Sequence, residues 1–403
     1  MTPPPHADRT RLVWTVGAWG VSGAESSRAP APRPRRGGLP QPISGSLGGP
    51  SDQGPIVERL APIPTRAVDD QLFFDLHNSY RAGRCQGYRW GDAARSTPFA
   101  AFEADVARLL LPEQRAVLLR TLRLGQKGFN LVKSGEHDRG LIERAMGLVP
   151  ELERGTVARA MAETFVCANA SYAHYRAGDF EAGIREAGAA LRAAGELHRD
   201  HDLRCFASRR LHLSNNYARV VAQGGDVAHA VSIVVEGLRY LEGTQPTSPF
   251  LNGPEPALRA DDHTYENQRI LSKQLVTTLH ALISASTRSR AELLGRVSPY
   301  RQESPPRPLP QVRGWLRVQA AAERGDSSEV VRLSSLFIAE GRGAYPILWH
   351  DAIAESAKCA RAYGSDIADR TYKSLLGDTT LLSGYPPNLE NRVQRLYAIA
   401  REW

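Results

Sequence analysis

The sequence of 403 residues contains no apolar run of 18 or more residues, so it predicts no membrane-spanning helix. Cysteine is scarce: the four thiols are far apart in the chain and form no CxxC pair. A zinc ribbon or a redox dithiol is therefore not indicated, and scattered thiols fit a reducing compartment. We expect a cytoplasmic protein with no membrane partner.

Lysine is also nearly absent. The chain has 51 Lys and Arg against 43 Asp and Glu, a net charge of +8, yet only five of the cations are Lys. Such an excess of Arg is typical of a GC-rich genome and is weak evidence for selection of a basic surface. Direct binding of nucleic acid is therefore not favoured by composition.

The common signatures of catalysis are missing as well. There is no GxxxxGK[ST] phosphate loop, no GxGxxG between a strand and a helix, no GxSxG elbow and no HExxH pair. His198 and His201 could share a helix face, but no third ligand is evident. The sequence predicts no cofactor, no metal site and no catalytic residue.

The first 64 residues differ from the rest of the chain. They contain 12 Pro and 9 Gly, in stretches such as APAPRPRRGG and SGSLGGPS. A segment of this composition cannot bury enough apolar surface to offset its loss of conformational entropy. We expect residues 1–64 to form a disordered tail.

From about Arg66 the pattern is that of amphipathic helices with few strand-like runs. Four segments pass from an apolar helix through a Gly and an acidic residue into a second helix. They are centred on Gly135-Glu136, Gly178-Asp179, Gly225-Asp226 and Gly325-Asp326. Gly can adopt the left-handed conformation that ends one helix, and the acid can cap the next.

One of these segments, Asn169–Ile184, resembles the core of a tetratricopeptide repeat. The small residues expected where its two helices cross, and the aromatic expected after the turn, are Ser171, Ala173, Gly183 and Phe180. Residues 216–238 match the same pattern less fully. The resemblance covers about residues 115–345 and implies a stack of helical hairpins, although the steps between turns are longer than the ~34 residues of the family.

We therefore predict an all-α fold: a right-handed α-solenoid of tetratricopeptide-like hairpins with a disordered N-terminal tail. The predicted units are the tail (1–64), an entry segment with a capping helix (65–114), a first hairpin block (115–243) and a C-terminal hairpin block (264–403). The last block should end with helices at Pro346–Tyr363, Ile367–Leu376 and Asn388–Arg401.

In such solenoids the first helix of each hairpin lines a concave surface. When the first helices are aligned on their Gly, amide side chains occupy the same position, nine residues earlier, at Gln126, Asn169 and Asn216. An amide offers both a donor and an acceptor, so a row of amides can hold a peptide backbone whatever its sequence. In peptide-binding members of the family, Asn at this position contacts the ligand backbone, which the resemblance implies for Asn169 and Asn216.

Other side chains extend this predicted site. One turn further along lie residues of the kinds that dominate binding hot spots, Phe129, Tyr172 and Arg219. Near the helix ends, Lys133 and Arg176 could receive a carboxylate. The alternative is that both Asn side chains are satisfied between packed helices.

The sequence thus favours a non-catalytic protein that binds a peptide or protein partner as a regulator or adaptor. Three alternatives stay open. The protein could hold a precursor peptide for a biosynthetic enzyme, or it could regulate transcription through a basic face formed by Arg204, Arg209, Arg210 and Arg219. It could also be an α-solenoid enzyme with a site among His198, His201, Asp202 and His212. A homodimer is compatible with each.

Overall fold

The computed structural model describes residues 70–86, 108–136, 139–203, 205–244, 262–285, 289–382 and 385–403. Within these ranges the protein consists of helices and their connections and contains no β-strand, which confirms the all-α prediction. The predicted tail, residues 1–64, lies outside the described residues. No helix in the described ranges is long and apolar enough to cross a bilayer.

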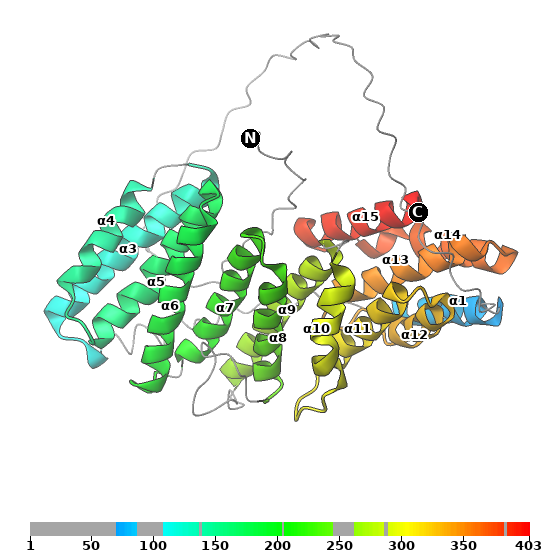
Figure 1. The fold of residues 1–403 in the computed structure, drawn as a ribbon, viewed down its shortest axis with the longest axis horizontal. Coiled ribbons are helices and arrows are strands. Elements are labelled where there is room, and N and C mark those ends of the chain that lie inside the picture. The colour runs from blue at the N-terminus through cyan, green and yellow to red at the C-terminus, as the bar shows by residue number, and fades with distance from the viewer. Residues whose placement is uncertain are drawn as a thin grey trace, which may run out of the picture.

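The helices lie side by side along the long axis of the molecule (Figure 1). The first set is α1 (Asp70–Arg84), α3 (Pro112–Ser134), α4 (Gly140–Leu148), α5 (Val157–Ala177), α6 (Phe180–Arg199), α7 (Cys205–Gln223) and α8 (Val227–Leu241). The second set is α9 (Asp262–Ala285), α10 (Arg290–Gln302), α11 (Pro310–Glu323), α12 (Ser327–Ala339), α13 (Pro346–Tyr363), α14 (Asp366–Gly377) and α15 (Pro387–Glu402). Two short 3-10 helices, Val149–Glu151 and Thr379–Leu382, complete the set.

The Gly-acid turns have the local geometry that the sequence predicts. The four glycines that end α3, α5, α7 and α11 all have positive φ: Gly135 (101°), Gly178 (81°), Gly225 (108°) and Gly325 (69°). Three of the following acids cap the next helix by accepting a backbone N–H. The pairs are Asp179 with Ala182 (3.2 Å), Asp226 with His229 (2.9 Å) and Asp326 with Glu329 (3.0 Å).

The first turn is the exception. Glu136 does not cap α4, because that helix begins four residues later, at Gly140, with Arg139 at its N-cap position and no side-chain cap. The prediction for Glu136 is therefore wrong. At the other end of the chain, α13 has the predicted bounds, and α14 and α15 begin and end within one residue of them.

Alternate helices pack against each other as well as against their neighbours in sequence. α3 contacts α5, α7 contacts α9, and α11 contacts α13, while α8 contacts α10. Two large apolar clusters result, one from Leu110 to Leu213 and one that runs from Leu211 to Ala400 and also takes in α1. Both clusters include residues of α7, so this helix joins the two halves of the core.

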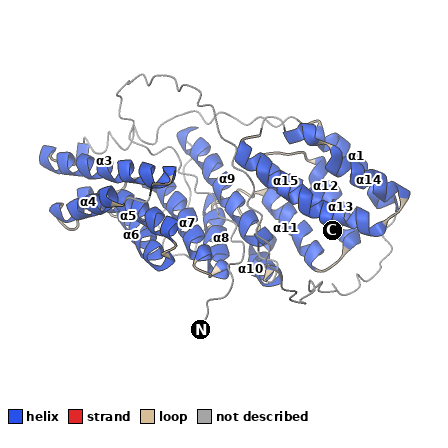
Figure 2. Ribbon diagram, turned by 90° about the horizontal axis from the view of Figure 1, so that it is seen from above, coloured by secondary structure: helices blue, strands red, loops and turns tan. Residues whose placement is uncertain are grey.

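The first described helix packs at the far end of the chain rather than next to α3. Figures 1 and 2 both show α1 beside α12 and α14. Phe73 and Tyr80 are fully buried there, with the Tyr80 ring stacked 5.9 Å from that of Trp349. The Thr371 hydroxyl also donates to the carbonyl oxygen of Phe73. The entry segment thus contributes its helix to the C-terminal part of the core.

Candidate functional site

The structure separates the eight residues of the predicted peptide site into two groups. One group lies on the packed pair α3 and α5 and contains Gln126, Phe129, Lys133, Asn169, Tyr172 and Arg176. The other group is Asn216 and Arg219, which lie on α7 and face α9. The two groups differ sharply in exposure.

The α3–α5 group, which we call the α3–α5 surface, combines two buried aromatic rings with accessible polar groups. The rings of Phe129 and Tyr172 are buried, and their centroids are 4.9 Å apart. Arg176 and Lys133 are exposed, and Arg176 donates to the Tyr172 hydroxyl at 3.2 Å. Asn169 is half-buried. Its amide nitrogen lies over Gly125, where a Cβ would come within 3.2 Å of it.

The α7 group belongs to a longer stripe of polar side chains on one helix face. Arg209, His212, Asn216 and Arg219 follow each other at spacings of three and four residues, and we call them the α7 row. All four are buried, with exposed fractions of 5% for Arg209, 4% for Asn216 and 2% for Arg219. The sequence placed Asn216 and Arg219 in the predicted peptide site and Arg209 and Arg219 in a predicted basic face, but it did not join all four residues in one row. The 3–4 spacing of polar residues was the available signal.

His212 sits at the centre of the row as a neutral ring. Its Nδ1 lies 3.1 Å from the amide oxygen of Gln274 on α9, and its Nε2 lies 3.1 Å from the amide nitrogen of Asn216. This pairing requires Nδ1 to carry the proton and Nε2 to accept. Burial, with smaller effects of the charges of Arg209 and Arg219, lowers the pKa of His212 to about 3. Asn216 is left with an amide oxygen that has no partner.

The two arginines of the row are held differently. Arg219 donates from Nε to the Thr278 hydroxyl of α9 at 3.1 Å. Arg209 stacks with its guanidinium 4.7 Å from the ring centroid of Phe165 on α5, and its Nε has no hydrogen-bond partner. Burial lowers the pKa of each to about 10. Beside the row, Asn215 is 1% exposed, and neither polar atom of its amide has a partner.

Because α9 covers this face of α7, a peptide could reach Asn216 and Arg219 only if α9 moved. The accessible part of the predicted site is therefore the α3–α5 surface. The amide nitrogen of Asn216 is bonded within its own helix, while its amide oxygen is buried without a partner, so the side chain is enclosed next to α9 but not fully satisfied there. Asn169 is not enclosed in this way.

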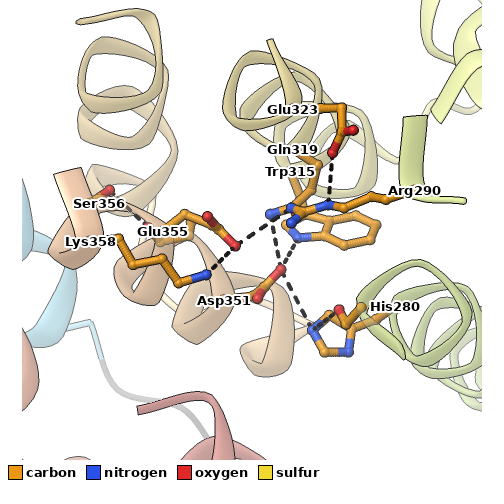
Figure 3. Close-up of polar contacts among 11 residues, drawn as sticks. His280, Arg290, Trp315, Gln319, Glu323, Asp351, Glu355, Ser356 and Lys358 are labelled. Carbon is orange, nitrogen blue, oxygen red and sulfur yellow. Dashed lines mark hydrogen bonds and ion pairs between the residues drawn. The ribbon is translucent and has the colours of Figure 1, made fainter. Parts of the chain in front are cut away.

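A second polar cluster joins α9, α10, α11 and α13 (Figure 3). At its centre the buried Asp351 carboxylate accepts from the indole N–H of Trp315 at 2.7 Å and from the amide of Gln319 at 3.0 Å. Gln319 also accepts a hydrogen bond from Arg290, which lies 3.5 Å from Glu355. These contacts link four helices through mutual hydrogen bonds, although the Nε of Arg290 has no hydrogen-bond partner and lies 3.8 Å from Glu323.

The same cluster contains an Asp, a His and a Ser, but not in a catalytic order. Asp351 Oδ2 and Ser284 Oγ lie 3.6 Å and 3.4 Å from the same ring nitrogen of His280, Nε2. In a nucleophilic triad the carboxylate and the hydroxyl must contact opposite nitrogens, so that the ring can move a proton between them. This geometry therefore cannot activate Ser284.

Two alternative functions, DNA binding by a basic face and catalysis at a site among the histidines, depend on where their residues lie. Arg209, Arg210 and Arg219 are buried, so these three do not form a surface that a DNA duplex could contact. His198 contacts Arg210 at 2.9 Å, and His212 faces Gln274. Among the described residues, no three His, Cys, Asp or Glu side chains come together as a metal site would require.

Comparison of the chain with protein-family models, with curated proteins and with solved structures found no match.

Proposed function

We propose that this protein is a non-catalytic, cytoplasmic helical-repeat protein that binds a peptide or protein partner on the α3–α5 surface. In this proposal the hairpins form a right-handed, tetratricopeptide-like solenoid, with α3, α5 and α7 as the first helices of successive hairpins. The repeated Gly-Asp cap at three turns supports a repeated unit, because it gives each hairpin the same local geometry.

The observation that carries the binding proposal is the arrangement around Asn169. Its half-buried amide lies over Gly125 on α3, next in sequence to the half-buried Gln126. An amide held on packed helices can pair with a peptide N–H and C=O at little entropic cost, because its position is already restricted. Lys133 and Arg176 add positive charge about two turns further along α3 and α5, and the buried Phe129 and Tyr172 rings pack against each other between the two helices.

Peptide display on the full-length protein tests this proposal. We expect immobilised wild-type protein to enrich peptides from a random-sequence library, and synthetic copies of those peptides to bind with micromolar affinity. The Asn169→Ala variant should weaken that binding by about tenfold, since a buried amide pairing is worth about 1–1.5 kcal/mol. The matched control is Gln302→Ala, which removes an exposed amide at the end of α10. Failure to enrich any peptide, or equal binding by both variants, would contradict the proposal.

A further inference from the structure

A small cavity lies between α4 and α6, over α5, against which both helices pack. Its volume is about 200 Å³, and we call it the α4–α6 cavity. Ile142, Ala170 and Ala173 line it and are buried. The half-buried Met146 completes the apolar part of the lining. An apolar cavity of about 150 Å³ is enough to hold benzene, so this one has room for a group the size of a leucine side chain.

The polar part of the lining consists of three charged side chains and a histidine. They are Arg139 and Glu143 from α4 and its N-cap, His174 from α5, and Glu186 from α6. In the described part of the chain none of the three charged groups forms an ion pair, although Arg139 and Glu143 are four residues apart. At the same spacing on α5, Arg159 and Glu163 pair at 2.8 Å. The charges around the cavity are therefore available to a ligand.

His174 does not supply the missing partner of Arg139. Its Nδ1 lies 3.4 Å from Nη1 of Arg139 and 3.1 Å from the carboxylate of Asp179. The backbone N–H of Ala182 lowers the pKa of Asp179, which is therefore ionised at neutral pH. An ionised carboxylate can only accept, so Nδ1 carries the proton and donates to Asp179. The same nitrogen cannot then accept from Arg139.

The spacing of the charges suits a small zwitterion. Arg139 and Glu143 are separated by about 6 Å along the axis of α4, and Glu186 adds a second carboxylate from α6. In an α-amino acid the ammonium and the carboxylate are joined through a single carbon, so hydrogen bonds of about 3 Å let both reach their partners within this span. A simple carboxylate would meet the two Glu side chains, and a simple amine would leave Arg139 unpaired.

We propose that the α4–α6 cavity binds a free α-amino acid with an apolar side chain about the size of leucine. The α-carboxylate pairs with Arg139, and the ammonium pairs with Glu143 and Glu186. The side chain occupies the apolar part of the cavity, which is the usual division of roles in a small-molecule site. Three contacts around the α-carbon make the site distinguish the two enantiomers. The ligand would connect α4 to α6.

This inference does not depend on the proposed function. The cavity is lined by Ala170, Ala173 and His174, whereas the α3–α5 surface uses Asn169 and Tyr172 on a different face of α5. The two sites can therefore be tested separately with variants of the same helix.

Isothermal titration calorimetry of the full-length protein with L-leucine tests the inference. The comparison ligands are D-leucine, 4-methylpentanoate, which lacks the ammonium, and 3-methylbutylamine, which lacks the carboxylate. We expect the preferred enantiomer to bind with a dissociation constant of about 100 μM or lower, and the other at least about fivefold more weakly. Each ligand without one charged group should lose at least about tenfold in affinity, because it loses a hydrogen bond between charged groups.

The variants assign the contacts. Arg139→Gln and Glu143→Gln should each weaken leucine binding by at least about tenfold at an unchanged melting temperature, because neither side chain forms an ion pair with a described residue. The matched control is Arg144→Gln, which removes an exposed charge from the same helix outside the cavity and should leave the affinity unchanged. Asn169→Ala should also leave it unchanged, which distinguishes this site from the α3–α5 surface.

Several results would overturn the inference. Neither enantiomer of leucine might bind at millimolar concentration, or both might bind equally. The amine or the carboxylate alone might match the affinity of the amino acid, in which case the second charge would have no role. Leucine binding that survives Arg139→Gln, or that is lost to the same extent in Arg144→Gln, would show that Arg139 does not hold the carboxylate.

Discussion

Glu242, just after α8, and Arg313, on α11, form a buried ion pair with 2.7 Å between carboxylate and guanidinium. The Glu242 carboxylate is fully buried and also accepts the backbone N–H of Leu309 at 2.7 Å. The pair therefore joins the end of α8 to the start of α11. It does so across a sequence separation of 71 residues.

Breaking this pair should strongly destabilise the protein. Glu242→Gln keeps an acceptor for Leu309 but leaves the Arg313 charge buried and unpaired, which costs about 3–5 kcal/mol. Urea unfolding measures this loss as a decrease in the free energy of unfolding. The double variant Glu242→Gln/Arg313→Met should be more stable than Glu242→Gln alone, because it also removes the cation. Asp369→Asn, which breaks the exposed pair with Lys373, should leave the unfolding midpoint unchanged, and additive losses in the double variant would contradict the prediction.

The contribution of the N-cap residues that follow the turn glycines can be measured by substitution. Asp226→Ala and Asp326→Ala each remove a side chain that accepts a backbone N–H, at a cost of about 1 kcal/mol. Glu136→Ala is the control at the equivalent place, and it should change the free energy of unfolding by less than about 0.5 kcal/mol, since Glu136 caps no helix. A loss at Glu136 equal to that at Asp226 would show that the caps are not the cause.

The docking of α1 depends on a glycine. A Cβ at Gly83 would overlap the carbonyl oxygen of Ile338, so Gly83→Ala must push α1 away from α12. We expect a loss of about 1–3 kcal/mol and faster amide exchange in residues 70–84, measured by mass spectrometry, with α3 to α6 unaffected. Gly295→Ala on α10, where an added methyl meets nothing, should be neutral or slightly stabilising. Unchanged exchange in α1 would rule out this contact.

Stability should fall as the pH drops below about 6.5. His350 is fully buried between the hydroxyls of Tyr397 (2.7 Å) and Tyr385 (3.1 Å). Burial, with a smaller effect of Arg342, lowers its pKa to about 3. The unfolded chain therefore binds a proton at a higher pH than the folded protein does. Between these pH values His350 should cost about 1.4 kcal/mol per pH unit.

The comparison variant for this effect is His350→Gln. Urea unfolding should be measured between about pH 4.5 and 6.5, above the usual titration range of carboxylates. In this range the free energy of unfolding of His350→Gln should depend less steeply on pH than that of the wild type, and the difference in slope should correspond to one bound proton. The remaining slope should come largely from His212, whose pKa is also lowered to about 3 by burial. An unchanged slope in His350→Gln would mean that this ring does not stay neutral in the folded protein.

The features that the sequence by itself determined are local. Gly178, Gly225 and Gly325 end helices in the left-handed conformation and the following Asp residues cap the next ones, because these interactions join residues only a few positions apart. The bounds of α13 were predictable for the same reason, since Pro346 begins the helix and Gly364 ends it. Apolar periodicity was sufficient to establish the all-α class.

Only the tertiary structure decided which helix covers which. α1 docks about 250 residues away, at Ile338, and α9 covers the polar face of α7, so Asn216 and Arg219 became buried while Asn169 stayed accessible. These outcomes depend on apolar contacts between distant segments, which are non-directional and leave no mark at a single position in the sequence. The same packing enclosed Arg209, which forms no ion pair with a carboxylate in the described part of the chain. A charge that looks like an exposed residue of a basic helix in the sequence is therefore a buried one in the fold.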